Sequence, residues 1–320
     1  MPHIDRVPTI QPRVVETCKS TLQVNQLSSS RRCRRRPITA HRMSSSSSDW
    51  FRGWRRIEGV FGDCEPSTIT LETLDAWYSA MLAKIGVREA HRAMKIWRAL
   101  WKICGALNFC DPNGDPFLGI RRVTPIGRSA TWTEGDLVRL VKAAWRSGYR
   151  GLAVIIAIAW DTGFSPVDAR RLCKNNRSPD GFRIPRAKTG KPAIGTLSPR
   201  AERLIAAYLA DQPEPMPGAP LFRNRSGAAY SKDTLGDDFR AVRGAVFPSD
   251  GRKLMDVRRS ASTEALAGGA SAEQIGSKMA NSIATNRELE RTYLPVDNAV
   301  VRLVDNARLV GRRAIRGTKV

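Results

Sequence analysis

The sequence predicts a mainly α-helical protein of two domains with one small β-hairpin. Apolar residues recur at helical spacing through most of residues 49–310, and an alternating pattern typical of strands occurs only in residues 181–197. The chain has 320 residues, which is long for a single core and comfortable for two domains. Hydrophobic residues make up 42% of it, so we expect a globular protein rather than a disordered one.

The charge of the chain points to a polyanionic partner. Lys and Arg number 53 against 30 Asp and Glu, which gives a net charge of +23 and a pI near 10.7. A surface this basic attracts nucleic acid and speeds the encounter with it, so we expect a nucleic-acid partner. The plainer alternatives are a soluble basic protein and an ordinary domain that carries a basic tail.

Several classes of protein are disfavoured by the sequence. The six cysteines form no C-x-x-C pair and have no histidine at ligand spacing, so we expect neither a zinc site nor a disulfide framework. The longest apolar run, residues 151–160, is about half the length that a bilayer crossing needs, so we expect no membrane partner. His3, His41 and His91 are the only histidines, which excludes a histidine-based site from the C-terminal two thirds of the chain.

Residues 1–48 predict a disordered basic and serine-rich tail. The segment contains an arginine cluster at residues 31–36 and five consecutive serines at residues 44–48. Three interpretations remain open: a flexible DNA-binding arm, an organelle transit peptide, or residues upstream of the true start codon. Met43 offers an alternative start immediately before the serines, which slightly favours the third interpretation.

Residues 49–120 predict a small helical domain, and residues 121–130 a linker. A helix entry at residues 70–73 precedes one apolar run at helical spacing, and a second run follows it. Basic residues surround the apolar face of the second run, where they would follow a phosphate backbone. Tryptophans at this spacing belong in a core more often than on a base-stacking surface, so we expect Trp97 and Trp101 to be buried.

The second domain, residues 131–320, predicts helices around a β-hairpin. Residues 151–160 are apolar on almost all sides and predict a buried helix. Ser165 is expected to cap a helix whose first residue is a proline. Residues 181–197 predict two strands joined by a turn that contains Lys188. Further helices are expected at residues 198–210, 233–246 and 258–310.

Five short segments of this domain carry the residue types of phosphoryl-transfer chemistry. A Thr-Gly pair comes first, a hairpin lysine second, a helical arginine third, an asparagine fourth and a tyrosine last. The segments are Thr162-Gly163-Phe164-Ser165, Lys188-Thr189-Gly190, Met255-Asp256-Val257-Arg258, Ala280-Asn281-Ser282 and Arg291-Thr292-Tyr293-Leu294-Pro295. Over about residues 50–310, this order resembles the tyrosine recombinase (phage integrase) family, of which the chain would be a divergent member.

Three residues match the catalytic pattern of that family. Tyr293 would be the nucleophile, since a phenolic oxygen can both attack and leave in reversible phosphoryl transfer. Arg258 would neutralise the non-bridging oxygens of the phosphate as charge builds in the transition state. Lys188, on a mobile hairpin, would protonate the departing 5′ oxygen. A lone helical arginine is usually a surface ion pair, and a lone tyrosine is usually a half-buried core residue. The assignment of these catalytic roles therefore depends on the residues occurring together in the order of the family pattern.

The chain departs from the family pattern at three positions. Ser165 stands where the family has an arginine, and we expect it to cap a helix and to make a weak phosphate contact. Met255 replaces a histidine and is expected to serve packing. Asn281 replaces a second histidine and can still donate a hydrogen bond to a phosphate oxygen. A substitute for the missing arginine would come from further away, and Arg186 and Lys191 on the hairpin are both candidates.

The resemblance implies a helical SAM-like core-binding domain, an integrase-type catalytic domain, and site-specific DNA recombination or integration. The protein would cut and rejoin double-stranded DNA through a 3′-phosphotyrosine, without metal or cofactor, as a homotetramer on two DNA sites. It would act in the cytoplasm, on the nucleoid. Residues 297–310 would be a helix exchanged between protomers or one that folds back on its own domain.

Two alternatives remain open from the sequence. One is a DNA-binding protein of the same fold that has lost catalysis, and the other is an unrelated basic helical protein. A role in a phage, in another mobile genetic element or in chromosome maintenance is equally open.

Overall fold

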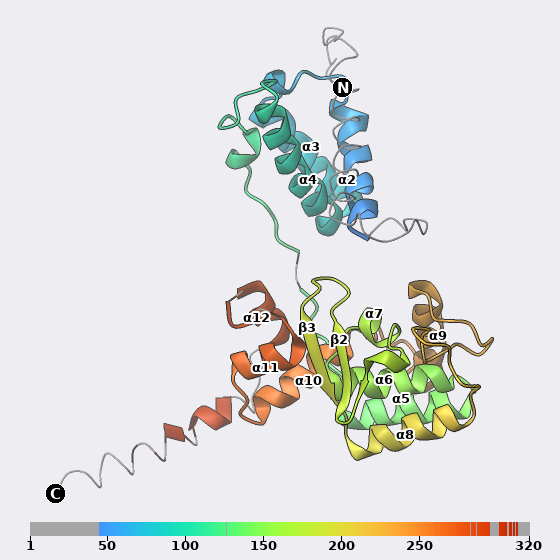
Figure 1. Ribbon diagram of the computed structural model, residues 1–320. Helices are drawn as coiled ribbons and strands as arrows, with labels where there is room; N and C mark the ends of the chain where they lie inside the picture. The colour runs from blue at the N-terminus through green and yellow to red at the C-terminus, as the bar shows by residue number, and fades with distance from the viewer. Residues whose placement is uncertain are drawn as a thin grey trace, which may run out of the picture. The chain divides into compact units, whose positions relative to one another are not determined.

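The chain forms two compact units, Met1–Ile126 and Gly127–Val320 (Figure 1). The computed structural model describes residues 45–125, 127–281, 283–285 and 287–294, together with 301–305, 307–308, 310 and 312. Most of the predicted tail, residues 1–44, lies outside the described residues. The predicted linker, residues 121–130, contains neither helix nor strand where it is described, and the second unit begins within it.

Three helices build the first unit. They are α2 (Ser45–Phe61), α3 (Leu71–Ile85) and α4 (Val87–Ala106), and two short 3₁₀ turns, η1 (Pro66–Thr68) and η2 (Pro116–Gly119), complete the unit. Thr70 caps α3 by accepting a hydrogen bond from the backbone nitrogen of Thr73. The first helix begins at Ser45, four residues before the predicted domain start, so the last serines of the predicted tail are helical.

Aromatic side chains form the core of the first unit. Trp97 and Trp101 are 4% and 5% exposed, and their rings stack with centroids 5.9 Å apart. Phe61 meets Trp97 edge to face at 5.2 Å, and the indole nitrogen of Trp97 donates to Asp115 at 3.1 Å. The prediction that these tryptophans belong to a core is confirmed, so their rings are not free to stack on bases.

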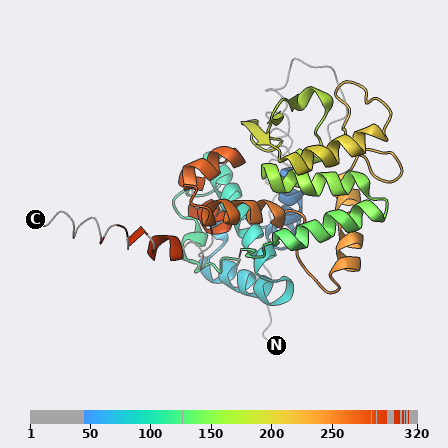
Figure 2. The same cartoon turned by 90° about the horizontal axis from the view of Figure 1, so that it is seen from below.

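A layer of helices supports the second unit. It contains α5 (Glu134–Arg146), α6 (Arg150–Thr162) and α8 (Pro199–Ala210), with α6 between the other two (Figure 2). The predicted buried helix is α6, and its residues from Leu152 to Ile156 are completely buried. A further helix, α9 (Lys232–Val246), packs against α5 and α6. An apolar helix enclosed in this way fixes the position of its own C-terminal end.

A three-stranded antiparallel sheet lies beside the end of α6. Its order is β1 (Arg177–Ser178), β2 (Gly181–Pro185) and β3 (Pro192–Thr196). The hairpin of β2 and β3 is the predicted one, and Phe182 pairs with Gly195 in its register. Phe182 and Ile184 are buried while Arg183 is exposed, which is the alternation that the sequence predicted. Strand β1 has only two residues, too few to show a period in the sequence.

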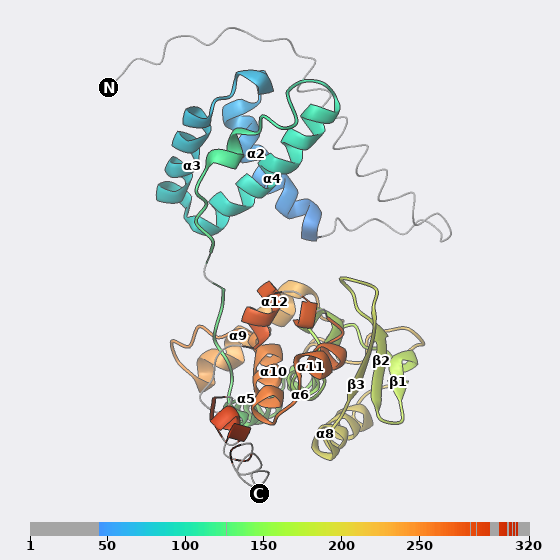
Figure 3. The ribbon, with the colours of Figure 1, turned by 90° about the vertical axis from the view of Figure 1, so that its left-hand side faces the viewer.

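The C-terminal helices close the unit against this scaffold. The remaining elements are α7 (Pro166–Ala169), η3 (Lys174–Asn176), α10 (Asp256–Ala267), α11 (Ala272–Met279), η4 (Ile283–Thr285) and α12 (Arg287–Tyr293). Helices α10, α11 and α12 lie together (Figure 3). Of the predicted exchanged helix, residues 301–305 are helical and exposed, and part of the rest lies outside the described residues. None of the described helices has the length and apolar character that a bilayer crossing requires.

Two glycines test the packing of the second unit in opposite directions. A Cβ atom on Gly195 would lie 2.6 Å from Phe164 and Thr162, whereas one on Gly236, inside α9, would meet nothing within 4 Å. We expect Gly195→Ala to lower the free energy of unfolding by about 1–3 kcal/mol. We expect Gly236→Ala to raise it by about 0.5–1 kcal/mol, because alanine favours the helix. Urea unfolding of both variants measures this, and equal effects would contradict the close contact at Gly195.

Candidate active site

Helix α10 carries an unusual number of buried polar residues. Asp256, Arg258, Arg259, Ser260 and Ser262 are all less than 9% exposed. Burying charged groups is costly unless they are paired or hydrogen-bonded, so such a cluster marks either a structural network or a functional site. The contacts of each residue show whether it belongs to a structural network or to a functional site.

Arg258 is held in place by backbone carbonyls at two helix ends. It is 5% exposed, and its guanidinium donates to the carbonyl oxygen of Gly163 and, at 2.8 Å, to that of Met279. Gly163 ends α6 with φ of 67°, a conformation that favours glycine. Burial lowers the pKa of Arg258, and the charge of Arg186 lowers it further, while a hydrogen bond and the charge of Tyr293 oppose both effects.

Tyr293 lies against Arg258. The guanidinium carbon of Arg258 is 5.4 Å from the centre of the Tyr293 ring, and the tyrosine is half-buried. The two residues are 35 positions apart, and α10 and α12 bring them together. The predicted arginine and the predicted nucleophile therefore share one site.

The neighbouring Arg259 fixes α12 through its backbone. Its Nε donates to the carbonyl oxygen of Thr292 at 2.6 Å, and its Nη1 donates to that of Ala130 at 3.0 Å. Arg259 is 7% exposed, and burial lowers its pKa, which Asp256 opposes. Arg258 thus faces the tyrosine ring while Arg259 anchors the residue before it.

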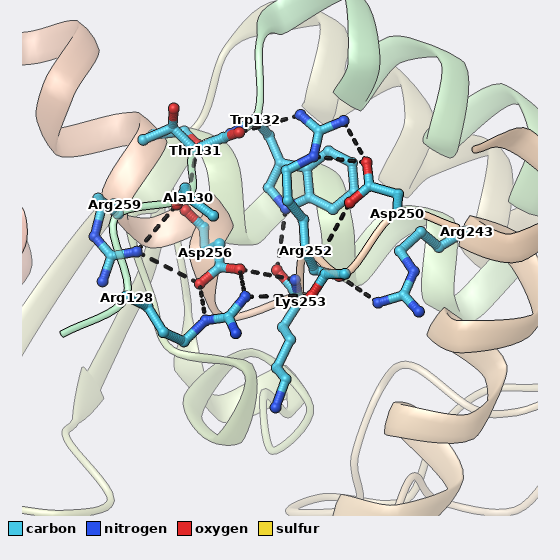
Figure 4. A network of polar contacts seen from close by, with 12 residues as sticks. Arg128, Ala130, Thr131, Trp132, Arg243, Asp250, Arg252, Lys253, Asp256 and Arg259 are labelled. Carbon is cyan, nitrogen blue, oxygen red and sulfur yellow. Dashed lines mark hydrogen bonds and ion pairs between the residues drawn. The ribbon is translucent and has the colours of Figure 1, made fainter. Parts of the chain in front are cut away.

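A polar network joins the start of α10 to the segment before α5 (Figure 4). Arg128 donates to both carboxylate oxygens of Asp256, at 3.0 and 2.6 Å, and the backbone nitrogen of Lys253 donates to the same carboxylate at 2.8 Å. The indole of Trp132 donates to the carbonyl oxygen of Lys253 at 3.0 Å, and its backbone nitrogen donates to Ser260 at 2.6 Å. Arg128 lies in the predicted linker, where no local sequence pattern indicates this bidentate pair.

The hairpin turn presents Lys188 to solvent. The backbone nitrogen of Arg186 donates to Lys191 and that of Gly190 donates to Arg186, both at 2.8 Å, and Gly190 has φ of 68°. Lys188 and Lys191 are exposed. Among the described contacts, none joins Lys188 to Arg258 or Tyr293, so the structure does not bring the predicted lysine into the same cluster.

Arg186 does reach that cluster. Its Nε lies 2.7 Å from a carboxylate oxygen of Asp168, and its Nη1 donates to the carbonyl oxygen of Met279, which also accepts from Arg258. The Arg186 side chain is only 12% exposed. Of the two candidates for the missing arginine, Arg186 is the one that the described contacts place next to Arg258, and Lys191 is exposed.

Ser165 and Asp168 hold the side chain of Arg186 in position. The Ser165 hydroxyl donates to Asp168 at 2.6 Å and accepts from the backbone nitrogen of Asp168 at 3.3 Å. The other carboxylate oxygen of Asp168 accepts from the backbone nitrogen of Ala187 at 2.8 Å. The expectation that Ser165 caps a helix is confirmed, and its weak phosphate contact stays a prediction.

Asn281 and Met255 have different surroundings from each other. The backbone nitrogen of Asn281 donates to Gly276 at 3.0 Å, while both polar atoms of its side chain are buried without a hydrogen-bond partner among the described residues. An unsatisfied buried amide is costly and is available to a ligand oxygen. Met255 is 58% exposed, so the expectation that it serves packing is wrong, because it precedes α10 on the solvent side.

Comparison with known proteins identifies the fold. No protein-family model matches the chain, and no curated protein sequence matches it significantly. A lambda integrase dimer bound to a COC′ core site is similar, with 13% identity, a TM-score of 0.66, and coverage of 80% of this chain and 90% of that one. The Tn1549 transposon integrase in complex with circular intermediate DNA has 13% identity and a TM-score of 0.64, covering 88% and 97%. The chain has the tyrosine recombinase fold.

A third structure agrees with this tyrosine recombinase fold. The XerH site-specific recombinase bound to a palindromic difH substrate has 13% identity and a TM-score of 0.64, and the match covers 82% of this chain and 79% of that one. The predicted fold class, mainly α with a small antiparallel sheet, is confirmed. The catalytic roles of Tyr293, Arg258, Lys188 and Asn281 and the phosphate contact of Ser165 stay predictions. In the part of the chain that the structure describes, no group of three His, Cys, Asp or Glu side chains is placed to hold a metal ion.

Replacing Arg259 by methionine should release α12 from α10 while Arg258 keeps its own contacts. The variant loses two hydrogen bonds from a charged donor, each worth about 1.5–3 kcal/mol. We therefore expect the backbone amides of α12 to exchange hydrogen at least roughly tenfold faster. Hydrogen exchange measured by mass spectrometry tests this, with the exposed Arg240→Met in α9 as the control. Unchanged exchange in α12 would show that Arg259 does not anchor it.

Proposed function

We propose that the protein is a site-specific DNA recombinase that cuts and rejoins DNA through a 3′-phosphotyrosine at Tyr293. The observation that carries the proposal is the buried guanidinium of Arg258 lying 5.4 Å from the Tyr293 ring. A preorganised cation beside a phenol suits a reaction in which negative charge builds on phosphate oxygens next to the attacking oxygen. The tyrosine recombinase fold supplies the context for that reaction.

The proposed reaction conserves the energy of the broken bond. The Tyr293 oxygen attacks phosphorus, so a phosphorus–tyrosine bond forms as the bond to the 5′ oxygen breaks, and the phenolic proton leaves to solvent. Lys188 gives a proton to the departing 5′ oxygen, which becomes a free hydroxyl. Rejoining reverses these steps when a 5′ hydroxyl of the partner strand attacks the phosphotyrosine. Asn281 donates a hydrogen bond to a non-bridging oxygen.

Double-stranded DNA is the proposed partner, bound by several copies of the chain. The net charge of +23 favours binding to phosphate, with a strong dependence on salt. The similar lambda integrase structures include a dimer on a core site and a tetramer on a Holliday junction. By that analogy, we propose that four copies act on two DNA sites.

The alternative is a DNA-binding protein of the same fold without catalysis. It is favoured by the residues at three catalytic positions of the family, where this chain has Ser165, Met255 and Asn281. Each missing donor would remove about 3 kcal/mol of transition-state stabilisation. This alternative predicts tight binding to a DNA site with no covalent product.

Tyr293→Phe tests the nucleophile directly. Nicked duplexes that tile the DNA flanking the gene are incubated with protein, and covalent complexes are separated on a denaturing gel. The nick lets the short fragment that carries the freed 5′ hydroxyl diffuse away. Rejoining is then prevented, so the phosphotyrosine accumulates. We expect an adduct from the parent protein and none from Tyr293→Phe, with equal DNA affinity, because the variant lacks only the attacking oxygen. An adduct that persists in Tyr293→Phe excludes Tyr293 as the nucleophile.

The role of Lys188 as a general acid depends on the leaving group. We expect Lys188→Ala to slow adduct formation about 10²–10⁴-fold on ordinary DNA, because the 5′ oxygen then departs without a proton. A duplex with sulfur in place of that 5′ oxygen should restore the rate, since a thiolate needs no proton to leave. Single-turnover rates on both substrates measure this, and Lys174→Ala, also exposed, is the control. An equal loss on both substrates would contradict acid catalysis.

A further inference from the structure

We propose that Arg186, on the β-hairpin, supplies the second phosphate-binding guanidinium of the site and replaces the arginine that is missing at Ser165. This inference rests on the proposed function and extends it, because it names the residue that completes the phosphate clamp. Three features of the molecule support it: the register of β2, a shared hydrogen-bond acceptor and an unbalanced buried charge.

The register of β2 turns Arg186 inward. Side chains alternate along a strand, and Phe182 and Ile184 are buried while Arg183 and Pro185 are exposed. Arg186 is the next residue on the inner face, directly after the last residue of β2. Its backbone nitrogen still donates across the hairpin to Lys191 at 2.8 Å, so the pairing continues through this position. The hairpin therefore delivers a guanidinium to the interior and not to solvent.

The guanidinium groups of Arg186 and Arg258 converge on one atom. Both donate to the carbonyl oxygen of Met279, the last residue of α11. Two side chains that share one acceptor place their positive charges within a few ångströms of each other, and the charge of Arg186 lowers the pKa of Arg258 accordingly. A pair of like charges held this close favours any anion that both can contact.

The carboxylates near the pair do not balance its charge. Asp168 pairs with Arg186 at 2.7 Å and its charge also acts on Arg258, whose described hydrogen bonds go to carbonyl oxygens and to Tyr293. Two cations and one anion leave a net charge of +1, matched to the single negative charge of a phosphodiester. Arginine presents several donors in a fixed fork, so each residue can keep a protein acceptor and still donate to a phosphate oxygen.

Ser165, at the position of the missing arginine, belongs to the hydrogen-bond network that holds Arg186 in place. Ser165 donates to Asp168, and Asp168 in turn holds both the guanidinium of Arg186 and the backbone nitrogen of Ala187. Asp168 is therefore a positioning residue, whereas Arg186 touches the phosphate. Arg186 would neutralise charge on a non-bridging oxygen without any change in its own bonds or protons.

A substrate without charge on the scissile phosphate separates this role from a structural one. The test uses whichever nicked duplex yields an adduct with the parent protein, and a second duplex with a methylphosphonate at the cleaved position. On the ordinary duplex, we expect Arg186→Gln to slow single-turnover adduct formation about 10²–10³-fold, and Arg186→Lys less. On the methylphosphonate, where no anionic oxygen needs neutralising, we expect Arg186→Gln to stay within about tenfold of the parent protein.

The control is Arg183→Gln, which removes an exposed arginine from the same strand. It should match the parent protein on both duplexes at saturating protein concentration. An Arg186→Gln variant that matches Arg183→Gln on the ordinary duplex would overturn the proposal. An equal loss on both duplexes would also overturn it, because that pattern reports a hairpin that is merely misplaced.

Inorganic phosphate provides a measurement that does not need a cleavable duplex. In protein with ¹⁵N-labelled arginine, the Nε–Hε resonances of Arg186 and Arg258 should shift together as phosphate is added at constant ionic strength. We expect Arg186→Gln to weaken the response of Arg258 at least about tenfold and Arg183→Gln to leave it unchanged. If no duplex gives an adduct with the parent protein, the proposed recombinase activity fails on its own. An undiminished Arg258 response in Arg186→Gln would then still refute the paired site.

Discussion

The arrangement of the second unit depends on keeping one buried guanidinium satisfied. Removing a cation from water costs several kcal/mol unless hydrogen bonds compensate for it. Arg258 obtains that compensation from the carbonyl oxygens of Gly163 and Met279, which end α6 and α11. Backbone oxygens at helix C-termini lack partners within the helix, so they are ready acceptors. One side chain of α10 therefore ties two helix ends together, and α12 brings Tyr293 to the same place.

The buried charges of α10 act in two directions because neighbouring residues of a helix point about 100° apart. Arg258 faces the ends of α6 and α11 and the ring of Tyr293. Arg259 and Asp256 instead reach Ala130 and Arg128 in the segment before α5, and Arg259 also holds the carbonyl of Thr292. The tyrosine is thus constrained through both its ring and its backbone. A nucleophile held by two separate contacts loses less freedom when it aligns with a phosphate, which favours the proposed chemistry.

Local features of this structure were predictable from the sequence, and long-range ones were not. The hairpin, the enclosed helix α6 and the cap at Ser165 follow from periodicity and capping within a few residues. The bidentate pair of Arg128 with Asp256 joins positions 128 residues apart, and no local sequence pattern predicts it. The exposure of Met255 was missed because its apolar side chain suggested a role in packing, while α10 begins only after it. Arg186 could be named as a candidate but not chosen, since its inward direction depends on where β2 ends.

Pairing at Asp168 also bears on whether the site has degenerated. A buried carboxylate that loses its cation becomes a large destabilising group, so loss of an arginine beside Asp168 would leave a marked defect. In this chain Asp168 is 2% exposed and fully engaged by Ser165, Arg186 and the backbone of Ala187. What matters to a phosphate is where the guanidinium stands and not which element supplies it. A serine that helps to hold an arginine from the hairpin therefore fits a phosphate-binding site that has been rearranged better than one that has lost its function.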